Sequence, residues 1–134
     1  MNKRFVVIGS NSFSGSSFIN YLLKRNNEVL GIYRSENLND VFLPYTWRKY
    51  NKKHLRRFRG DLNLDSKSIF KCINDFKPNY VVNFAAQGMV AESWKNPIDW
   101  YKTNVVAQVE LHDFLRKLGY LKKYIHVSTP EVYG

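Results

Sequence analysis

The chain has 134 residues, 44% of them hydrophobic, and its 21 Lys and Arg against 11 Asp and Glu give a formal charge of +10. This length and composition fit one folded domain and exclude a disordered chain, while the positive charge favours anionic partners. A single cysteine, Cys72, excludes a disulfide framework, and no stretch is apolar enough for a secretory signal or a membrane span. We therefore expect a cytoplasmic protein with no membrane partner.

The apolar pattern of the first half predicts strands and helices in alternation. Residues 5–8 form a continuously apolar, β-branched strand of the kind that is buried on both faces. From Gly15 the apolar positions repeat as one face of a helix. A second strand, an irregular segment and a short third strand follow, at residues 28–33, 35–53 and 54–61.

The second half continues this alternation. Asp65 is placed to cap a helix that Pro78 ends. A strand, a long helix and a last strand then follow, at residues 80–86, 99–118 and 123–128. Such an order needs crossover connections, which favour a mostly parallel sheet with helices on both faces. The long helix has one apolar stripe for the sheet and a second for another surface, formed by Tyr101, Val105 and Val109.

The segment GSNSFSG, at residues 9–15, joins the first strand to the first helix. A phosphate-binding turn needs a tight bend, a close backbone approach to the pyrophosphate and close packing of helix on strand. Gly9 and Gly15 meet the first and last needs, and Ser12 stands where the middle glycine is expected, with a hydroxyl able to donate to a phosphate. Because a buried strand precedes it and an amphipathic helix follows, we interpret the segment as a variant dinucleotide-binding turn.

Five segments, taken in order, resemble those of a known family: GSNSFSGSSF, RGDL, VVNFAAQGMV, YKTNVVAQVELHDFLR and HVSTPEVYG. Together they resemble the extended short-chain dehydrogenase/reductase family, and within it the nucleotide-sugar 4,6-dehydratases that act on GDP-mannose and dTDP-glucose. The resemblance implies an α/β fold, a Rossmann-like doubly wound parallel sheet with strand order 3-2-1-4-5. It also implies the cofactor-binding half of a dehydratase or epimerase that transiently oxidises C4 of a nucleotide-linked hexose.

The same resemblance implies which residues hold a nicotinamide dinucleotide. They are Gly9, Ser12, Phe13, Ser14, Gly15, Asp61, Leu62, Ala85, Ala86, Gln87 and Asn104. It further implies that Thr129 bonds the sugar hydroxyl that is oxidised and that Glu131 removes the C5 proton. Pro130 stands where those dehydratases have an aspartate or a serine, which leaves an epimerase or a reductase open.

The end of the second strand bears on the choice of cofactor. A site for NAD places a carboxylate there for the ribose 2′-hydroxyl, whereas this strand is followed by Arg34 and Ser35. An arginine fork and a serine hydroxyl suit a 2′-phosphate, so we expect NADP, with NAD as the alternative. The three histidines have no ligand spacing, and we expect no metal.

The end of the chain bears on catalysis. In the family, a catalytic Tyr-x-x-x-Lys helix and a substrate domain follow this region, whereas Tyr133 is followed here by Gly134 alone. We therefore expect residues 1–134 to be an N-terminal NAD(P)-binding domain that does not turn over a nucleotide sugar by itself. The resemblance also implies a homodimer formed through the helix 99–118.

Two other functions stay open at this stage. Residues 47–59 hold seven Lys and Arg with aromatic side chains between them, a pattern typical of a surface for single-stranded nucleic acid. A solvated basic face explains the same residues without such a partner. The second alternative is a sensor that binds a dinucleotide without catalysis.

Overall fold

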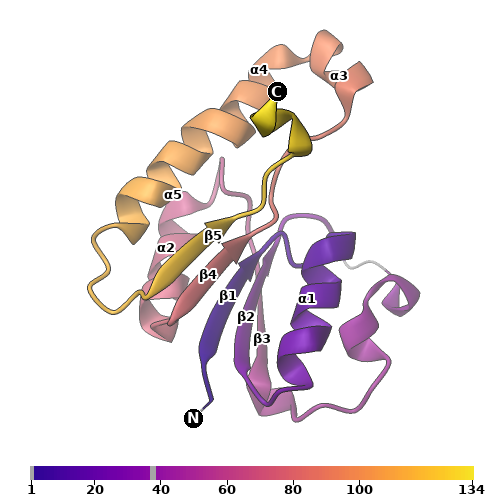
Figure 1. The fold of residues 1–134 in the computed structure, drawn as a ribbon, viewed down its shortest axis with the longest axis vertical. Helices are drawn as coiled ribbons and strands as arrows, with labels where there is room; N and C mark the ends of the chain where they lie inside the picture. Colours follow the sequence, from indigo (N-terminus) through magenta and orange to yellow (C-terminus); the bar gives the residue numbers. More distant parts are fainter. Residues whose placement is uncertain (1, 37–38) are drawn as a thin grey trace.

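The computed structural model describes residues 2–36 and 39–134. Five parallel strands form one sheet in the order β3-β2-β1-β4-β5, with helices on both faces (Figure 1). The strands are β1 (Arg4–Ile8), β2 (Glu28–Tyr33), β3 (Leu55–Arg59), β4 (Tyr80–Asn83) and β5 (Lys123–His126). The Rossmann-like doubly wound sheet and its strand order are therefore confirmed.

Two hydrophobic cores lie on opposite faces of the sheet, because successive side chains of a strand point to opposite sides. Val7 of β1 packs under α1 (Phe13–Leu23). Its neighbour Val6 packs under α2 (Ser66–Phe76) and α5 (Ala107–Leu115). Both valines are fully buried, as the continuously apolar pattern of this strand predicted.

The first two helices begin close to the predicted positions, but the predicted cap residue of the second makes no capping hydrogen bond. α1 begins at Phe13, ahead of the predicted Gly15, because the Ser12 hydroxyl oxygen accepts a hydrogen bond from the Gly15 N–H at 3.0 Å. α2 begins directly after Asp65, as predicted. The Asp65 carboxylate, however, accepts from the Asp61 N–H at 2.9 Å and makes no capping hydrogen bond to α2.

Three strands are shorter than the sequence pattern predicted. β4 ends at Asn83 and not at residue 86, because the Asn83 amide oxygen accepts from the Ala85 N–H at 2.9 Å and the chain leaves the sheet. β3 and β5 likewise cover only residues 55–59 and 123–126. The residues that follow these strands therefore lie in the loops beyond their carboxyl ends.

The segment between β2 and β3 is less irregular than predicted. It packs Leu43 and Tyr45 against α1, and both side chains are buried. Residues 37–38 of this segment lie outside the described part of the chain. Its short 3₁₀ turns are Asp40–Phe42, Pro44–Thr46 and Lys52–His54.

The long helix predicted over residues 99–118 is interrupted in the structure. After α3 (Val90–Lys95), α4 (Pro97–Tyr101) leads into a π-helical turn at Lys102–Val106. α5 continues from this turn and ends at Leu115. A π turn inside a helix often lies at a functional site, because it shifts the side chains that follow it.

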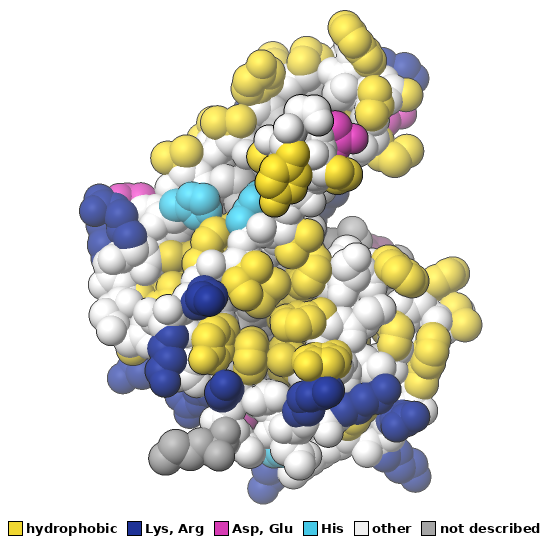
Figure 2. Space-filling view, viewed as in Figure 1, with side chains coloured by type: hydrophobic (Ala, Val, Ile, Leu, Met, Phe, Trp, Pro, Cys, Tyr) yellow, Lys and Arg dark blue, Asp and Glu magenta, His cyan; other side chains and the backbone are white. Residues whose placement is uncertain are grey.

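The two predicted apolar stripes of this helical arm are confirmed. Ala107 and Leu111 are buried on the sheet, whereas Tyr101, Val105 and Val109 are 68%, 49% and 62% exposed. Figure 2 shows hydrophobic side chains along the arm at the top of the view. None of the helices formed by residues 2–36 and 39–134 has the length and apolar composition needed to cross a lipid bilayer.

Candidate functional site

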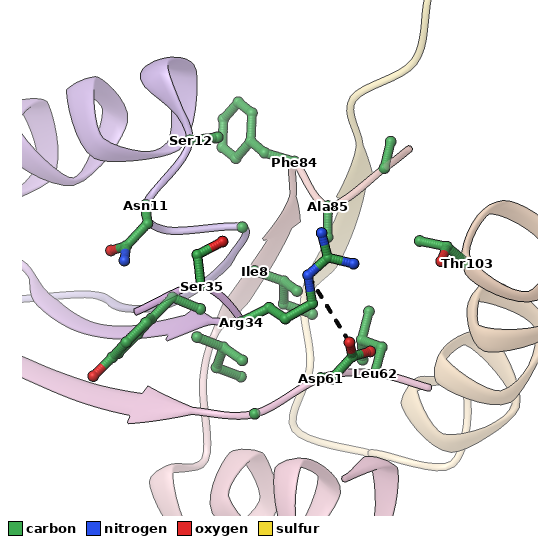
Figure 3. Close-up of a pocket in the computed structure, with 15 residues that line it drawn as sticks. Ile8, Asn11, Ser12, Arg34, Ser35, Asp61, Leu62, Phe84, Ala85 and Thr103 are labelled. Carbon is green, nitrogen blue, oxygen red and sulfur yellow. Dashed lines mark ion pairs between the residues drawn. The ribbon is translucent and has the colours of Figure 1, made fainter. Parts of the chain in front are cut away.

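A pocket of about 220 Å³ opens where the carboxyl ends of the parallel strands meet (Figure 3). The connection after β1 passes over one face of the sheet, and the connection after β4 passes over the other face. Ligands of parallel sheets bind at the point where two such connections diverge. Its lining residues come from the segments that follow β1, β2, β3 and β4 and from the π turn. They are Ile8, Gly9, Asn11, Ser12, Ile32, Tyr33, Arg34, Ser35, Gly60, Asp61, Leu62, Phe84, Ala85, Ala86 and Thr103.

The structure brings most of the predicted cofactor residues together at this pocket. Phe13, Ser14 and Gly15 lie next to it in the first turn of α1. Gln87 and Asn104 are not part of the lining, nor are the predicted catalytic residues. The predicted residues that line the pocket are Gly9, Ser12, Arg34, Ser35, Asp61, Leu62, Ala85 and Ala86.

The glycine-rich turn has the tight geometry that its sequence predicted. Gly9 has a φ of +78°, and a Cβ placed on it would lie 2.9 Å from the backbone nitrogen of Ala85. A Cβ on Gly15 would lie 2.3 Å from the carbonyl oxygen of Gly9. Neither position has room for a side chain, so the turn, α1 and the loop after β4 approach one another closely.

Ser12 caps α1 and also lines the pocket. Its hydroxyl oxygen accepts from the Gly15 N–H, which leaves the hydroxyl hydrogen able to donate to a ligand. The first turn of α1 contains no acidic residue, so no carboxylate there competes with an anionic ligand for the N-terminal end of the helix. A serine in place of the middle glycine therefore keeps the features of an anion-binding turn.

Arg34 and Asp61 face each other at the pocket, as Figure 3 shows. The Arg34 Nε atom lies 3.9 Å from Asp61 Oδ2, and the second carboxylate oxygen of Asp61 accepts from the Asn63 N–H at 2.8 Å. The pair connects the end of β2 to the end of β3. The contact between these two residues was not predicted from the sequence.

A buried amide network holds the wall of the pocket on the β4 side. Asn83 is fully buried and donates to the Gln108 side-chain oxygen at 2.7 Å, while it accepts from the Ala85 N–H. Gln108 in turn donates to the Thr103 carbonyl oxygen at 3.1 Å. The Thr103 hydroxyl accepts from the Asn63 amide at 3.0 Å. The network therefore fixes the pocket residues Ala85 and Thr103 relative to each other.

Sequence analysis missed this network, although a signal for it was present. Asn83 interrupts the apolar run YVVNFAA, and Gln108 lies one residue after Ala107, which belongs to the stripe that faces the sheet. A polar residue buried in such a context needs hydrogen-bond partners. The bond that joins the two side chains could not be read from the sequence, because Asn83 and Gln108 are separated by 25 residues.

Gln87 and Asn104 form a reciprocal pair beside the pocket. The Gln87 N–H donates to the Asn104 amide oxygen at 2.9 Å, and the Asn104 amide donates to the Gln87 carbonyl at 2.9 Å. Asn104 therefore anchors the loop after β4 to the π turn. Its contact with a cofactor stays a prediction.

Thr129 and Glu131 lie at the end of the chain, where a 3₁₀ turn at Pro130–Tyr133 follows β5. The Thr129 hydroxyl donates to the Glu131 carboxylate, and both residues are exposed. Because β5 lies next to β4 in the parallel sheet, Thr129 and Glu131 lie at the same edge of the sheet as the pocket. Their catalytic roles stay predictions.

A titratable group adjoins the buried amide network. The Tyr124 hydroxyl lies 3.1 Å from the Asn83 amide nitrogen and 3.0 Å from Nδ1 of His126. Burial raises the pKa of Tyr124 above its ordinary value. Burial also lowers the pKa of His126, and the neighbouring His112 lowers it further. Protonation of His126 therefore opposes the folded arrangement.

The basic segment at residues 47–59 does not form an open aromatic platform. Phe58 packs against the core under α2, and the Tyr50 hydroxyl donates to Asn20 of α1 at 2.5 Å. Trp47 is exposed, and its indole N–H donates to the Asp40 carbonyl at 2.9 Å. Two of the three interleaved aromatic side chains are therefore engaged by the fold and not offered to stacked bases.

The chain is similar to known proteins over nearly all of its length. The family model for GDP-mannose 4,6 dehydratase matches residues 6–134. A GDP-mannose 4,6-dehydratase from Vibrio cholerae is 29% identical over 140 residues, which cover 100% of this chain and 37% of that protein. The chain thus spans well under half the length of this curated relative.

Solved structures show the same fold. The UDP-Glc/GlcNAc 4-epimerase from Campylobacter jejuni superposes with a TM-score of 0.82 at 23% identity, over 99% of this chain and 39% of that one. WbmH from Bordetella bronchiseptica, solved in complex with NAD+, has a TM-score of 0.79 at 22% identity, over 100% of this chain and 42% of its own. Nucleic-acid binding and a non-catalytic sensor find no support in these comparisons.

Proposed function

Because the chain belongs to the GDP-mannose 4,6-dehydratase family, we propose that it is the cofactor-binding part of a nucleotide-sugar 4,6-dehydratase or epimerase. The observation that carries this proposal is the single pocket at the strand ends, which gathers the glycine-rich turn, the end of β2, Asp61–Leu62 and Ala85–Ala86. A nicotinamide dinucleotide is the ligand that such a set of segments holds in this fold.

The residues present fit such a dinucleotide. The pyrophosphate would lie over the turn at Gly9 and Ser12, where the absence of a side chain at Gly9 allows a close backbone approach. The adenosine would lie at the ends of β2 and β3, beside Asp61 and Leu62. Ser35 and the arginines at the ends of β2 and β3 support NADP in preference to NAD, because cationic and hydroxyl donors suit a 2′-phosphate.

The reaction would use residues of this chain that follow β5. A bound nicotinamide dinucleotide supplies acceptance and return of a hydride. We assign Thr129 to the sugar hydroxyl that is oxidised and Glu131 to the C5 proton, which a C4 ketone makes acidic. Their mutual hydrogen bond supports a shared place of action at the sheet edge. A homodimer through the exposed stripe of the α4–α5 arm is part of the same proposal.

Calorimetric titration of the chain with NADP+, and separately with NAD+, tests the cofactor site. We expect saturable binding that Gly15→Ala abolishes, because the added Cβ displaces the turn against the Gly9 carbonyl. Gly119→Ala is the matched control, because no atom of the described residues lies within 4 Å of the added Cβ. A chain that binds neither dinucleotide, or that binds them unchanged after Gly15→Ala, would contradict the proposal.

A further inference from the structure

A second arginine lies at the rim of the pocket and was not among the predicted site residues. Arg57 of β3 donates from Nη2 to the Asn11 amide oxygen at 3.2 Å. Its guanidinium carbon lies 4.5 Å from the centroid of the Tyr33 ring and 5.8 Å from that of Tyr45. Asn11 and Tyr33 both line the pocket. The Arg57 side chain is therefore held in place beside the pocket by a hydrogen bond and by aromatic contacts.

Arg57 differs from two nearby arginines in whether its charge is paired with a carboxylate. Arg34 pairs with Asp61 at 3.9 Å, and Arg59 pairs with Glu36 at 3.6 Å. Arg57 forms no ion pair with any carboxylate in the part of the chain that the structure describes. The positive charge that remains uncompensated at this rim is thus on Arg57 and not on Arg34.

The groups around Arg57 offer donors to a ligand. A guanidinium has five N–H donors, of which Asn11 occupies one. The Asn11 amide nitrogen is buried and has no hydrogen-bond partner among residues 2–36 and 39–134. Ser35 adds a hydroxyl from the end of β2, and Figure 3 shows Asn11 and Ser35 on the side of the pocket away from Thr103. Several donors without a matching acceptor suit an anion with several oxygens.

We propose that Arg57, positioned by Asn11 and Tyr33, is the residue that selects a ribose 2′-phosphate at this pocket. In this fold the adenosine ribose lies at the end of β2 opposite the glycine-rich turn, where Asn11 and Ser35 both line the pocket. Arg34 then neutralises Asp61 and does not read the phosphate. The inference rests on the proposed dinucleotide site, and it names the side chain that sets the choice of NADP over NAD.

The test compares 2′,5′-ADP (adenosine 2′,5′-bisphosphate) with 5′-AMP, because the two nucleotides differ only in the 2′-phosphate. Calorimetric dissociation constants are measured for the wild-type chain and for Arg57→Gln, Arg57→Lys, Arg34→Gln and Arg59→Gln. Loss of a charge-assisted contact in Arg57→Gln should reduce the preference for 2′,5′-ADP by about tenfold or more and change 5′-AMP affinity by less than about twofold. Arg57→Lys should restore part of the preference, because it keeps the charge.

The controls separate this inference from the function on which it rests. Arg59→Gln removes the same charge from the same strand and should leave the preference unchanged. If the wild-type chain binds 5′-AMP without preferring 2′,5′-ADP, or if only Arg34→Gln lowers the preference, the role of Arg57 is overturned and the dinucleotide site stands. If the wild-type chain binds neither nucleotide, the proposed function and the inference both fail.

Discussion

The Arg34 guanidinium lies 3.9 Å from the Asp61 carboxylate, so the ends of β2 and β3 are joined by an ion pair at the pocket. The side chain of Arg34 is 54% exposed and that of Asp61 is 20% exposed. Such a partly exposed pair contributes little to stability, and its effect is on which charges a ligand meets. Because Arg34 and Asp61 neutralise each other, the other charged groups at the pocket determine which ligand is preferred.

Asp61→Asn should therefore raise the preference for 2′,5′-ADP over 5′-AMP. The substitution removes the partner of Arg34 and frees a second guanidinium for the anion. Competition titrations of the two nucleotides measure the change, with Asp75→Asn as a control of equal charge in α2, away from the pocket. A lower preference in Asp61→Asn would show that the carboxylate itself supports the phosphate-bearing ribose.

Asn83→Ala should destabilise the fold by about 2–4 kcal/mol, because it leaves buried hydrogen-bonding groups of Gln108 and Ala85 without partners. Urea unfolding followed by circular dichroism gives the free energy. Asn74→Ala is the matched control, since the Asn74 amide accepts only an exposed hydrogen bond from Tyr120. Equal losses for the two variants would contradict the role assigned to the buried network.

The fold of this chain was accessible from its sequence because the strongest signals are local. β2 covers residues 28–33 as predicted, and the apolar runs of β1 and β4 gave the parallel, doubly covered sheet. The ends of the helices and strands were harder to predict from the sequence, because hydrogen bonds of side chains determine where they lie. The Asn83 side chain ends β4, and the long helix contains a π turn where Gln108 bonds the Thr103 carbonyl.

The same distinction applies to the site. The glycine-rich turn was predictable, because its tight backbone requires residues without a side chain at Gly9 and Gly15. Arg57 was not, because its neighbours in sequence suggest a solvated basic run while its contact with Asn11 spans 46 residues. Thr103 was missed for a similar reason, since it reaches the pocket only through the interrupted helix.

Stability should fall as the pH drops below the ordinary pKa of histidine, and His126 should account for part of the loss. Its pKa is lowered in the folded chain, so the unfolded chain binds the proton first and unfolding is favoured at low pH. The loss begins near the reference value of 6.5 and is complete below the folded pKa. Urea unfolding of wild type and His126→Gln between pH 7.5 and pH 5.5, conditions that bracket about one unit on each side of that value, measures the difference.

His54→Gln serves as the control for this pH dependence, because His54 lies in the 3₁₀ turn before β3, away from Tyr124 and His112. We expect this variant to keep the wild-type slope, whereas His126→Gln flattens it. An unchanged slope in His126→Gln would exclude His126 as a source of acid sensitivity.

Val109→Glu should dissociate a homodimer formed through the α4–α5 arm. Val109 is 62% exposed on the stripe that does not contact the sheet, so a charge there costs the isolated chain little but opposes an apolar interface. Sedimentation velocity gives the oligomeric state. Val132→Glu, at an equally exposed valine outside the arm, is the control. A monomeric wild-type chain would refute the dimer for these residues.

The central claim is that the strand-end pocket binds a nicotinamide dinucleotide, and an NMR titration tests it most directly. A ¹H–¹⁵N spectrum of the chain is followed as NADP+ is added. The account predicts progressive shifts of the amide signals of Gly9, Ser12, Asp61 and Ala85, with those of the exposed face of α5 unchanged. Shifts confined to the basic segment 47–59, or no shifts at all, would contradict it.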